Sequence, residues 1–168
     1  GRVDLGVTGM PDVPRGMVGL VVGAAPMVAV VAPSHPLAAH RGVVPTAVLE
    51  QHLQLVVADQ SSHSADRDFH VLSPRTWRLA DFSLRHEMLL AGVGWGRMPF
   101  GSVERDLQEK RLVAIQPEVW AERTPSVDMR VVYRADTPPG PAATWLTKEL
   151  VARGRAWEER IRADIACG

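Results

Sequence analysis

Apolar residues occur in short runs separated by Gly, Pro and charged residues, and the clearest succession of elements lies between Thr76 and Pro99. Residues 76–80 (TWRLA) are rich in β-branched and aromatic side chains, which predicts a strand. Asp81 can then cap a helix, because its carboxylate can accept a free backbone N–H of the first turn. Residues 82–91 contain no Gly or Pro, which predicts a helix with one apolar face at i, i+4, i+7. The residues assigned to that face are Leu84, Met88 and Ala91.

The end of this helix predicts a return to the sheet. Gly92 suits a left-handed C-terminal cap, because it has no Cβ. Residues 93–98 then form a second strand, which Pro99 ends because it cannot donate to a ladder. Two strands joined by one helix predict a parallel, right-handed crossover. Ligands of such sheets bind outside the carboxyl ends of the strands, here residues 80–81 and 98–100.

The remaining pattern predicts an α/β chain. The segment 59–74 (DQSSHSADRDFHVLSP) is polar without a helical period, which leaves a long loop or a single helical turn. The face of the last helix is assigned to Leu146, Leu150, Trp157, Ile161 and Ile165, with Gly154 as a bend or a point of close packing. The predicted strands are 3–8, 19–22, 26–32, 53–58, 111–115 and 127–134, and the predicted helices are 44–52, 101–110 (starting at Ser102, with Val103 and Leu107 inward) and 142–165.

These elements group into two lobes. Residues 51–127 form a self-contained α/β unit, and residues 1–50 together with 128–168 form the other lobe. The chain therefore crosses between lobes twice, which predicts a cleft between them.

Composition narrows the function. Lys and Arg balance Asp and Glu, so the formal net charge is +0, which argues against nucleic acid binding by this segment alone. The single cysteine, Cys167, excludes a disulfide framework and favours a reducing compartment, so we expect a cytoplasmic protein. No apolar run reaches membrane-spanning length, since Gly23, Pro26 and Pro33 interrupt the nearest one, and no signal peptide is visible. The absence of an initiator Met gives the sequence the look of a piece of something longer.

Three motifs in order resemble one family. Residues 1–7 (GRVDLGV) match a G-x-hydrophobic-D-hydrophobic strand, and residues 28–38 (VAVVAPSHPLA) match an apolar strand ending in His-Pro-Leu-Ala. Residues 90–99 (LAGVGWGRMP) match an AG-hydrophobic-G-x-x-x-x-P segment, and a helix followed by a basic-Leu-Val strand comes after it at 107–113. The chain resembles, over nearly its whole length, the effector-binding domain of LysR-type transcriptional regulators.

The resemblance implies a fold and a function. The expected fold is α/β and type II periplasmic-binding-protein-like, with two Rossmann-like lobes around a central cleft and with the first lobe incomplete. A small-molecule co-inducer in the cleft would shift the lobes, and this shift would change how an oligomer holds DNA. The DNA-binding helix-turn-helix is absent from this chain, so DNA is a partner only through that domain. The resemblance also implies a homo-oligomer whose contacts are an edge strand and a helix of each lobe. No cofactor, metal, membrane or enzymatic activity is implied.

The expected effector contacts lie at strand ends. By resemblance, the loop after the first strand of the second lobe faces the cleft, and its hydroxyl and amide groups suit a carboxylate. Thr8 is the expected contact from the first lobe, and an apolar rim at 98–100 suits an aromatic or aliphatic body. The expected ligand is therefore a small aromatic or aliphatic acid. The proposed effector-binding residues are Thr8, Gln60, Ser61, Ser62, Met98, Pro99 and Phe100, with Asp59 and His63 on the same loop.

Two other functional hypotheses stay open at this point. A solute-binding protein of a transport system shares the fold, although the His-Pro-Leu-Ala run favours a regulator. An enzyme is the third reading, but the histidines show no metal-ligand spacing and no G-x-S-x-G elbow is present. Trp77 and Trp95 are expected to be adjacent core residues. By resemblance to the family, His35 is expected to have a hinge or structural role. The missing strand of the first lobe would expose a sheet edge, which predicts oligomerisation or strand exchange.

Overall fold

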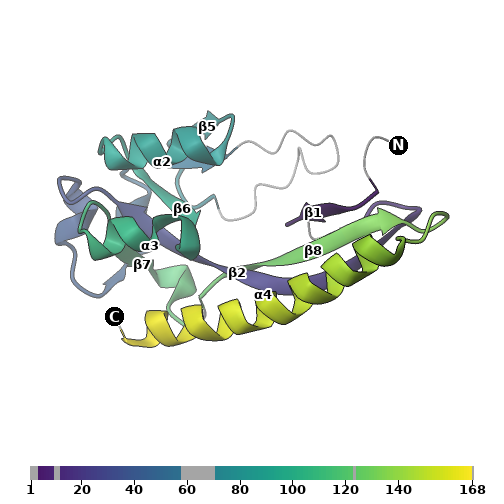
Figure 1. Cartoon of the computed structure of the whole chain (residues 1–168). Coiled ribbons are helices and arrows are strands. Elements are labelled where there is room, and N and C mark those ends of the chain that lie inside the picture. The colour runs from purple at the N-terminus through teal and green to yellow at the C-terminus, as the bar shows by residue number, and fades with distance from the viewer. Residues whose placement is uncertain (1–3, 10–11, 58–70, 123, 168) are drawn as a thin grey trace. The chain divides into compact units, whose positions relative to one another are not determined.

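The computed structural model describes residues 4–9, 12–57, 71–122 and 124–167, and the last six of these are described by their backbone alone. The chain forms two compact units (Figure 1). Unit 1 consists of Gly1–Pro26 and Ser126–Gly168, and unit 2 of Met27–Pro125. The predicted lobe boundaries were at residues 50–51 and 127–128. The first boundary of the structure lies earlier, between Pro26 and Met27. It falls within one long strand, β2 (Met17–Val31), which contributes residues to both units.

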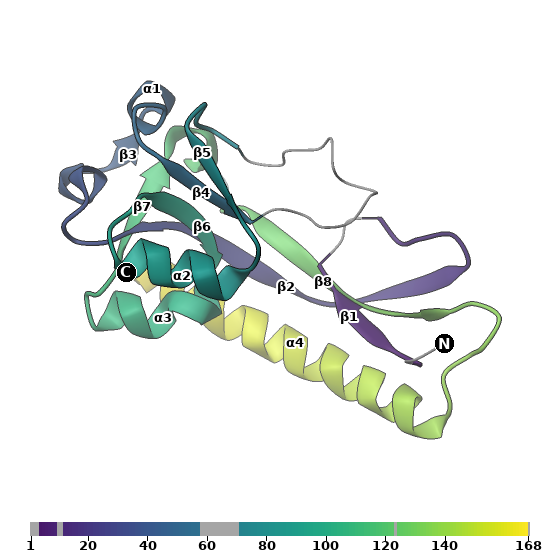
Figure 2. The same ribbon diagram turned by 90° about the horizontal axis from the view of Figure 1, so that it is seen from above.

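Unit 1 is an antiparallel sheet with one long helix. The strand β8 lies between β1 and the first part of β2 and is antiparallel to both. The helix α4 runs alongside β2 and β8 in both views (Figures 1 and 2). The elements besides β2 are β1 (Gly6–Thr8), β8 (Ser126–Arg134) and α4 (Pro141–Cys167).

Two glycines let α4 touch the backbone of β2. A Cβ on Gly154 would lie 1.8 Å from the carbonyl oxygen of Val22, and a Cβ on Gly23 would lie 3.3 Å from the backbone of Gly154. Of the face predicted for α4, Ile161 is buried whereas Leu146 is exposed. Gly154 therefore serves close packing, one of the two roles that the sequence suggested.

Unit 2 is a mixed sheet with helices. Its strand order is β2-β6-β4-β5, in which β6, β4 and β5 are parallel and β2 is antiparallel to β6. The strand β7 pairs with β2 and with β3. The elements are η1 (Pro36–Ala39), β3 (Val43–Val44), α1 (Thr46–Leu49), β4 (Gln54–Val57), β5 (Thr76–Leu79), α2 (Phe82–Leu90), β6 (Trp95–Pro99), α3 (Phe100–Gln108), β7 (Val113–Pro117) and η2 (Glu118–Trp120).

The core of unit 2 has two parts, which take alternate residues of the strands because successive side chains point to opposite faces. Trp95 belongs to one part and Met98 to the other. The first part consists of Ala29, Val31, Leu37, Val44, Leu49, Trp95, Ile115 and Trp120. The second consists of Val30, Leu55, Leu79, Leu89, Met98, Val103 and Leu112.

The predicted strand, helix and strand at 76–99 are confirmed. The Asp81 Oδ1 accepts a hydrogen bond of 2.8 Å from the backbone N–H of Leu84, which is the predicted N-terminal cap. Gly92 has a φ of +74° directly after the helix, as a left-handed cap requires. The strands β5 and β6 are parallel, since each pairs in parallel with β4.

The predicted face of this helix is confirmed for Met88, which packs against the core of unit 2, and is wrong for its other two residues. Leu84 and Ala91 are exposed, and the residues of α2 that are buried are Arg85 and Leu89. Arg85 was not among the residues assigned to the face, but the apolar stem of an arginine can pack in a core.

Three further expectations are corrected. Trp77 and Trp95 are not adjacent, because β4 lies between β5 and β6, and Trp77 is 52 % exposed while Trp95 is in the core. The strands predicted at 19–22 and 26–32 are one strand, because Gly23 takes part in a bulge and the chain stays extended through it. The helix α3 begins at Phe100 and not at Ser102, because Pro99, with its fixed φ of −57°, already turns the chain.

Candidate functional site

The connections from the parallel strands of unit 2 lead to opposite sides of β4. The chain runs from β4 to β5 on one side of β4, and α2 then carries it back to β6 on the other side. Figure 2 shows α2 beside these strands. The point between β4 and β6 is therefore a topological switch point, at whose carboxyl edge open α/β sheets bind ligands.

The ladder between β4 and β6 is short. Its registered pairs are Gln54 with Trp95 and Leu55 with Gly96. Arg97 is thus the first residue of β6 beyond the last pair, and on its other side it is paired with Ala29 of β2. Arg97 lies where β4 and β6 stop pairing.

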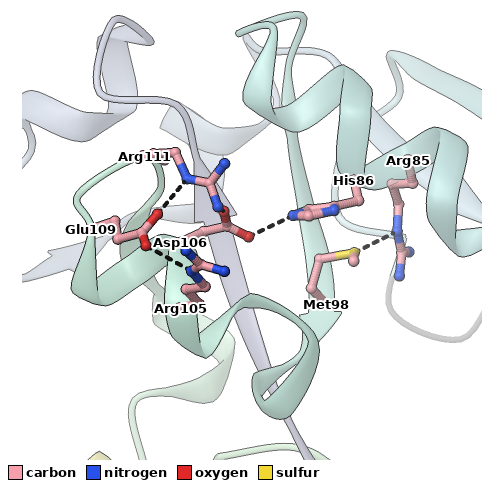
Figure 3. A network of polar contacts seen from close by, with 7 residues as sticks. All are labelled: Arg85, His86, Met98, Arg105, Asp106, Glu109 and Arg111. Atoms are coloured by element: carbon pink, nitrogen blue, oxygen red, sulfur yellow. Dashed lines mark hydrogen bonds and ion pairs between the residues drawn. The ribbon is translucent and has the colours of Figure 1, made fainter.

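Arg85 reaches the same end of the ladder from α2. Its Cδ would lie 3.6 Å from a Cβ built on Gly96, and its Nε donates to the sulfur of Met98 at 3.3 Å. The centre of its guanidinium lies 4.6 Å from the centroid of the Phe82 ring, a cation–π contact. Figure 3 shows this side chain beside Met98, on the opposite side of Met98 from Asp106 and Glu109.

Both guanidinium groups lack a counter-charge among the described residues. Arg85 is only 6 % exposed, and its Nη2 has no hydrogen-bond partner. The Nη1 of Arg97 is also buried without a partner. Burial, and then the charge of Arg97, lower the pKa of Arg85 to about 10. Burial also lowers the pKa of Arg97. The end of β6 is therefore a place of uncompensated positive charge.

A second polar side chain on α2, His86, has by contrast a buried carboxylate beside it. The Nε2 of His86 lies 2.7 Å from Oδ2 of Asp106 on α3, and Arg111 Nη2 lies 2.5 Å from Asp106 Oδ1, although without hydrogen-bond geometry (Figure 3). Asp106 is 3 % exposed, and its carbonyl accepts from the backbone N–H groups of Arg111 and Leu112. Glu109 pairs with Arg105 and Arg111. We call Asp106, His86 and Arg111 the Asp106 cluster; it ties α2 to α3.

The segment that enters β5 is fixed by a buried amide. The Oε1 of Gln54 accepts hydrogen bonds from the backbone N–H groups of Leu72 (2.8 Å) and Ser73 (3.0 Å). The hydroxyl of Ser73 donates to the carbonyl of His52 at 2.9 Å. These bonds fix the position of β5 beside β4.

The predicted site residues fall into three groups. Gln60, Ser61 and Ser62, with their neighbours Asp59 and His63, lie outside the described residues. Thr8 is in β1 of unit 1, opposite Arg130 of β8. Met98 is a core residue, whereas Pro99 and Phe100 are half-buried where β6 joins α3.

Sequence reasoning missed both arginines. A signal for Arg97 was present, because it is a lone charge in an otherwise apolar strand, WGRMP. Arg85 had a weaker signal, its spacing of four residues from Leu89 on one helix face. No group of three or more His, Cys, Asp or Glu side chains in the described part of the chain could hold a metal ion. None of the helices in the described ranges is long and apolar enough to cross a membrane.

Comparison with known families decides the classification. Residues 1–155 match the model of the LysR substrate binding domain. The chain belongs to the LysR substrate-binding domain family. The family is one of transcription regulators and not of enzymes, and its regulatory domains have the type II periplasmic-binding-protein-like fold, so the predicted family and fold class are confirmed.

Individual relatives agree. The chain is 28 % identical over 123 residues to the probable HTH-type transcriptional regulator YhaJ of Escherichia coli (strain K12), covering 72 % of this chain and 39 % of YhaJ. It thus spans about two fifths of the length of that relative.

Solved regulatory domains share the fold at low identity. That of MetR, a LysR family regulator from N. meningitidis, gives a TM-score of 0.70 at 18 % identity and covers 92 % of this chain and 72 % of the MetR chain. The regulatory domain of Synechocystis CcmR, in complex with 2-PG, gives a TM-score of 0.71 at 16 % identity and covers 91 % of this chain and 74 % of the CcmR chain.

Proposed function

We propose that the chain is the effector-sensing regulatory portion of a DNA-binding transcriptional regulator. The observation that carries this proposal is the family match over residues 1–155. The solved complex of the CcmR regulatory domain with 2-PG supports a small-molecule ligand for a domain of this fold. DNA would be held by a helix-turn-helix outside this chain, in keeping with the formal net charge of +0.

The proposed effector site lies at the carboxyl edge of unit 2. Switch points of open α/β sheets are where ligands bind, and the half-buried Pro99 and Phe100 stand at this edge. Gln60, Ser61 and Ser62 follow β4 in the sequence and are proposed as polar contacts. Met98, which is buried, would act from beneath by holding Arg85. Thr8 stays a proposed contact from unit 1.

The proposed mechanism is a shift of populations. An effector that binds one conformation of the regulator better than another moves the equilibrium toward it, by no more than its differential affinity. The chain itself then needs no catalytic group. The regulator would work in the cytoplasm, where DNA and small metabolites meet.

We propose further that the regulator is a homo-oligomer that uses β5 and α2. Among the described strands, β5 is an edge of the unit 2 sheet and pairs with β4 alone. Large apolar side chains on these two elements are exposed, which is typical of interaction surfaces. They are Trp77 (52 % exposed), Phe82 and Leu84.

The family match disfavours the alternative of a solute-binding protein. A chimeric regulator distinguishes the sensor hypothesis from the solute-binding hypothesis. Fused behind the DNA-binding domain of a LysR-type regulator, the chain should make transcription from that regulator's promoter depend on an added small molecule. A panel of small aromatic and aliphatic acids and neutral analogues, first screened by thermal shift on the chain, supplies the candidates. Ligands that stabilise the chain but never change transcription in the chimera would contradict the proposed function.

A further inference from the structure

The unpaired guanidinium groups are the least expected feature of unit 2. A buried charge is costly unless it is paired and hydrogen-bonded. The described residues nevertheless leave Arg85 Nη2 and Arg97 Nη1 without hydrogen-bond partners. In the neighbouring Asp106 cluster, by contrast, the carboxylate lies within ion-pair distance of His86 and Arg111. A second positive charge near the first adds repulsion, as the lowered pKa of Arg85 reflects. Both side chains lie at the switch point, where a ligand can supply what the protein lacks.

The guanidinium of Arg85 is held in a fixed orientation. Its Nε donates a hydrogen bond to the Met98 sulfur, and the centre of the guanidinium lies over the Phe82 ring. Those contacts leave Nη2 as its buried nitrogen without a partner. Orienting a donor before binding lowers the entropy cost of binding. An arginine used only for its apolar stem would not need this support.

Gly96 provides the space for the arginine stem. A Cβ there would lie 3.0 Å from the carbonyl oxygen of Leu55 and 3.6 Å from Cδ of Arg85. Gly96 and Met98 are on the face of β6 toward α2, and Arg97 between them starts from the opposite face. The two cationic side chains thus start from the two faces of β6 near its end, and their charges interact, which suits one anion bound there.

We propose that Arg85 and Arg97 bind the anionic group of the effector, a carboxylate, phosphate or sulfate. Arginine suits this role because its planar fork binds such oxyanions in a bidentate way. The assignment as effector rests on the proposed function, whereas the anion site itself does not. Neither arginine was among the residues that the sequence suggested.

The test measures anion binding directly on the chain. Sodium phosphate, sodium sulfate and sodium benzoate are titrated against sodium chloride at constant ionic strength, by calorimetry and by thermal shift. At least one of the three should bind the parent, and Arg97→Met should weaken that binding at least about tenfold, since losing one partner of a buried charge pair has a large cost. Arg85→Lys keeps the charge but loses the fork, so it should also bind more weakly. Arg105→Met is the matched control, because Arg105 lies on the surface of α3 in an exposed pair with Glu109, and it should bind like the parent.

Two results would overturn the inference. The first is that none of the three anions binds the parent, or that Arg97→Met and Arg105→Met bind as the parent does. The second is an internal counter-charge. The sequence 58–70 contains Asp59, Asp66 and Asp68. The test is to replace one of these aspartates by Asn in the parent and in Arg97→Met. If the replacement destabilises the parent more than it destabilises Arg97→Met, and added anions do not stabilise the parent, the arginines are paired within the chain.

The same variants separate this inference from the proposed function. If anions bind through the arginines but never change transcription in the chimera, the anion site stands and the sensor function fails. If a neutral ligand controls the chimera and Arg97→Met responds as the parent does, the sensor function stands and the anion site fails.

Discussion

The two sides of α2 carry charged residues in opposite circumstances. His86 points toward α3, where the buried Asp106 lies between it and Arg111 (Figure 3). Its neighbour in sequence, Arg85, is buried like Asp106. The contacts of the Arg85 guanidinium are the sulfur of Met98 and the ring of Phe82. Two successive residues of one helix therefore differ: His86 lies beside a carboxylate, whereas Arg85 has no counter-charge among the described residues.

The difference separates structure from binding. A paired buried charge fixes the position of one element on another, and removing either partner leaves the remaining one uncompensated. An unpaired buried charge destabilises the free protein and is useful once a counter-charge arrives. We therefore expect substitutions in the two groups to change the free energy of unfolding in opposite directions.

The largest effect is expected at Asp106. Asp106→Asn removes the charge at nearly constant volume and so weakens the contacts to His86 and Arg111. Hydrogen bonds to charged groups contribute about 1.5–3 kcal/mol each, so the free energy of unfolding in urea should fall by roughly 2–3 kcal/mol. Glu109→Gln is the control, since Glu109 is a more exposed partner of Arg111 and should show little change. If Glu109→Gln lowers the free energy of unfolding as much as Asp106→Asn does, burial does not distinguish the two carboxylates.

A smaller effect of opposite sign is expected at Arg85. Arg85→Met replaces an unpaired buried charge by an apolar side chain of similar length beside Met98 and Leu89, both of which are buried. Replacing buried ionic groups with apolar residues has stabilised other proteins by about 1–4 kcal/mol. In chloride buffer without oxyanions, we expect a gain of about 1 kcal/mol in urea unfolding. A loss of stability in that buffer would show that Arg85 already has a counter-charge.

Local chemistry explains which parts of the fold the sequence could predict. Asp81 and Gly92 frame α2 because each satisfies a requirement within one turn of itself, a cap acceptor and a positive φ. Gly154 was a candidate for close packing because a missing side chain in a long helix has few other uses. Such signals depend on a few neighbouring residues and survive in any tertiary context.

The candidate site depended on information that a single sequence does not hold. Arg85 is buried because α2 lies over β6, whose Gly96 and Met98 come eleven and thirteen positions later in the chain, and because β4 separates β5 from β6. The i, i+4, i+7 spacing of Leu84, Met88 and Ala91 placed the helix face toward Leu84, which is exposed in the structure. The strand end at Met98–Phe100 was anticipated as a ligand edge, yet the charge there came from residues that were passed over.

The smallest effect concerns a third buried group without a counter-charge, His35. Its Nδ1 accepts from the backbone N–H of Leu37 at 3.2 Å, and its ring meets that of His52 edge to face at 5.0 Å. Burial, and then His52, lower the pKa of His35 below its ordinary 6.5. The unfolded chain therefore binds a proton at a higher pH than the folded one, so stability is full above about pH 6.5 and declines as the pH falls below it. The slope stays under about 1.4 kcal/mol per pH unit, the value for one whole proton.

His35→Asn tests this assignment, because the Asn side-chain oxygen can still accept from Leu37 but does not titrate. Urea unfolding between pH 7.5 and 5, at pH values chosen around the ordinary histidine pKa of about 6.5, should show a flatter profile for His35→Asn than for the parent. His40→Asn is the matched control, since His40 is exposed at the other end of the same short helix and should leave the profile unchanged. If His40→Asn flattens the profile and His35→Asn does not, then burial without a counter-charge is not what makes this part of unit 2 sensitive to acid, and the parallel with Arg85 fails.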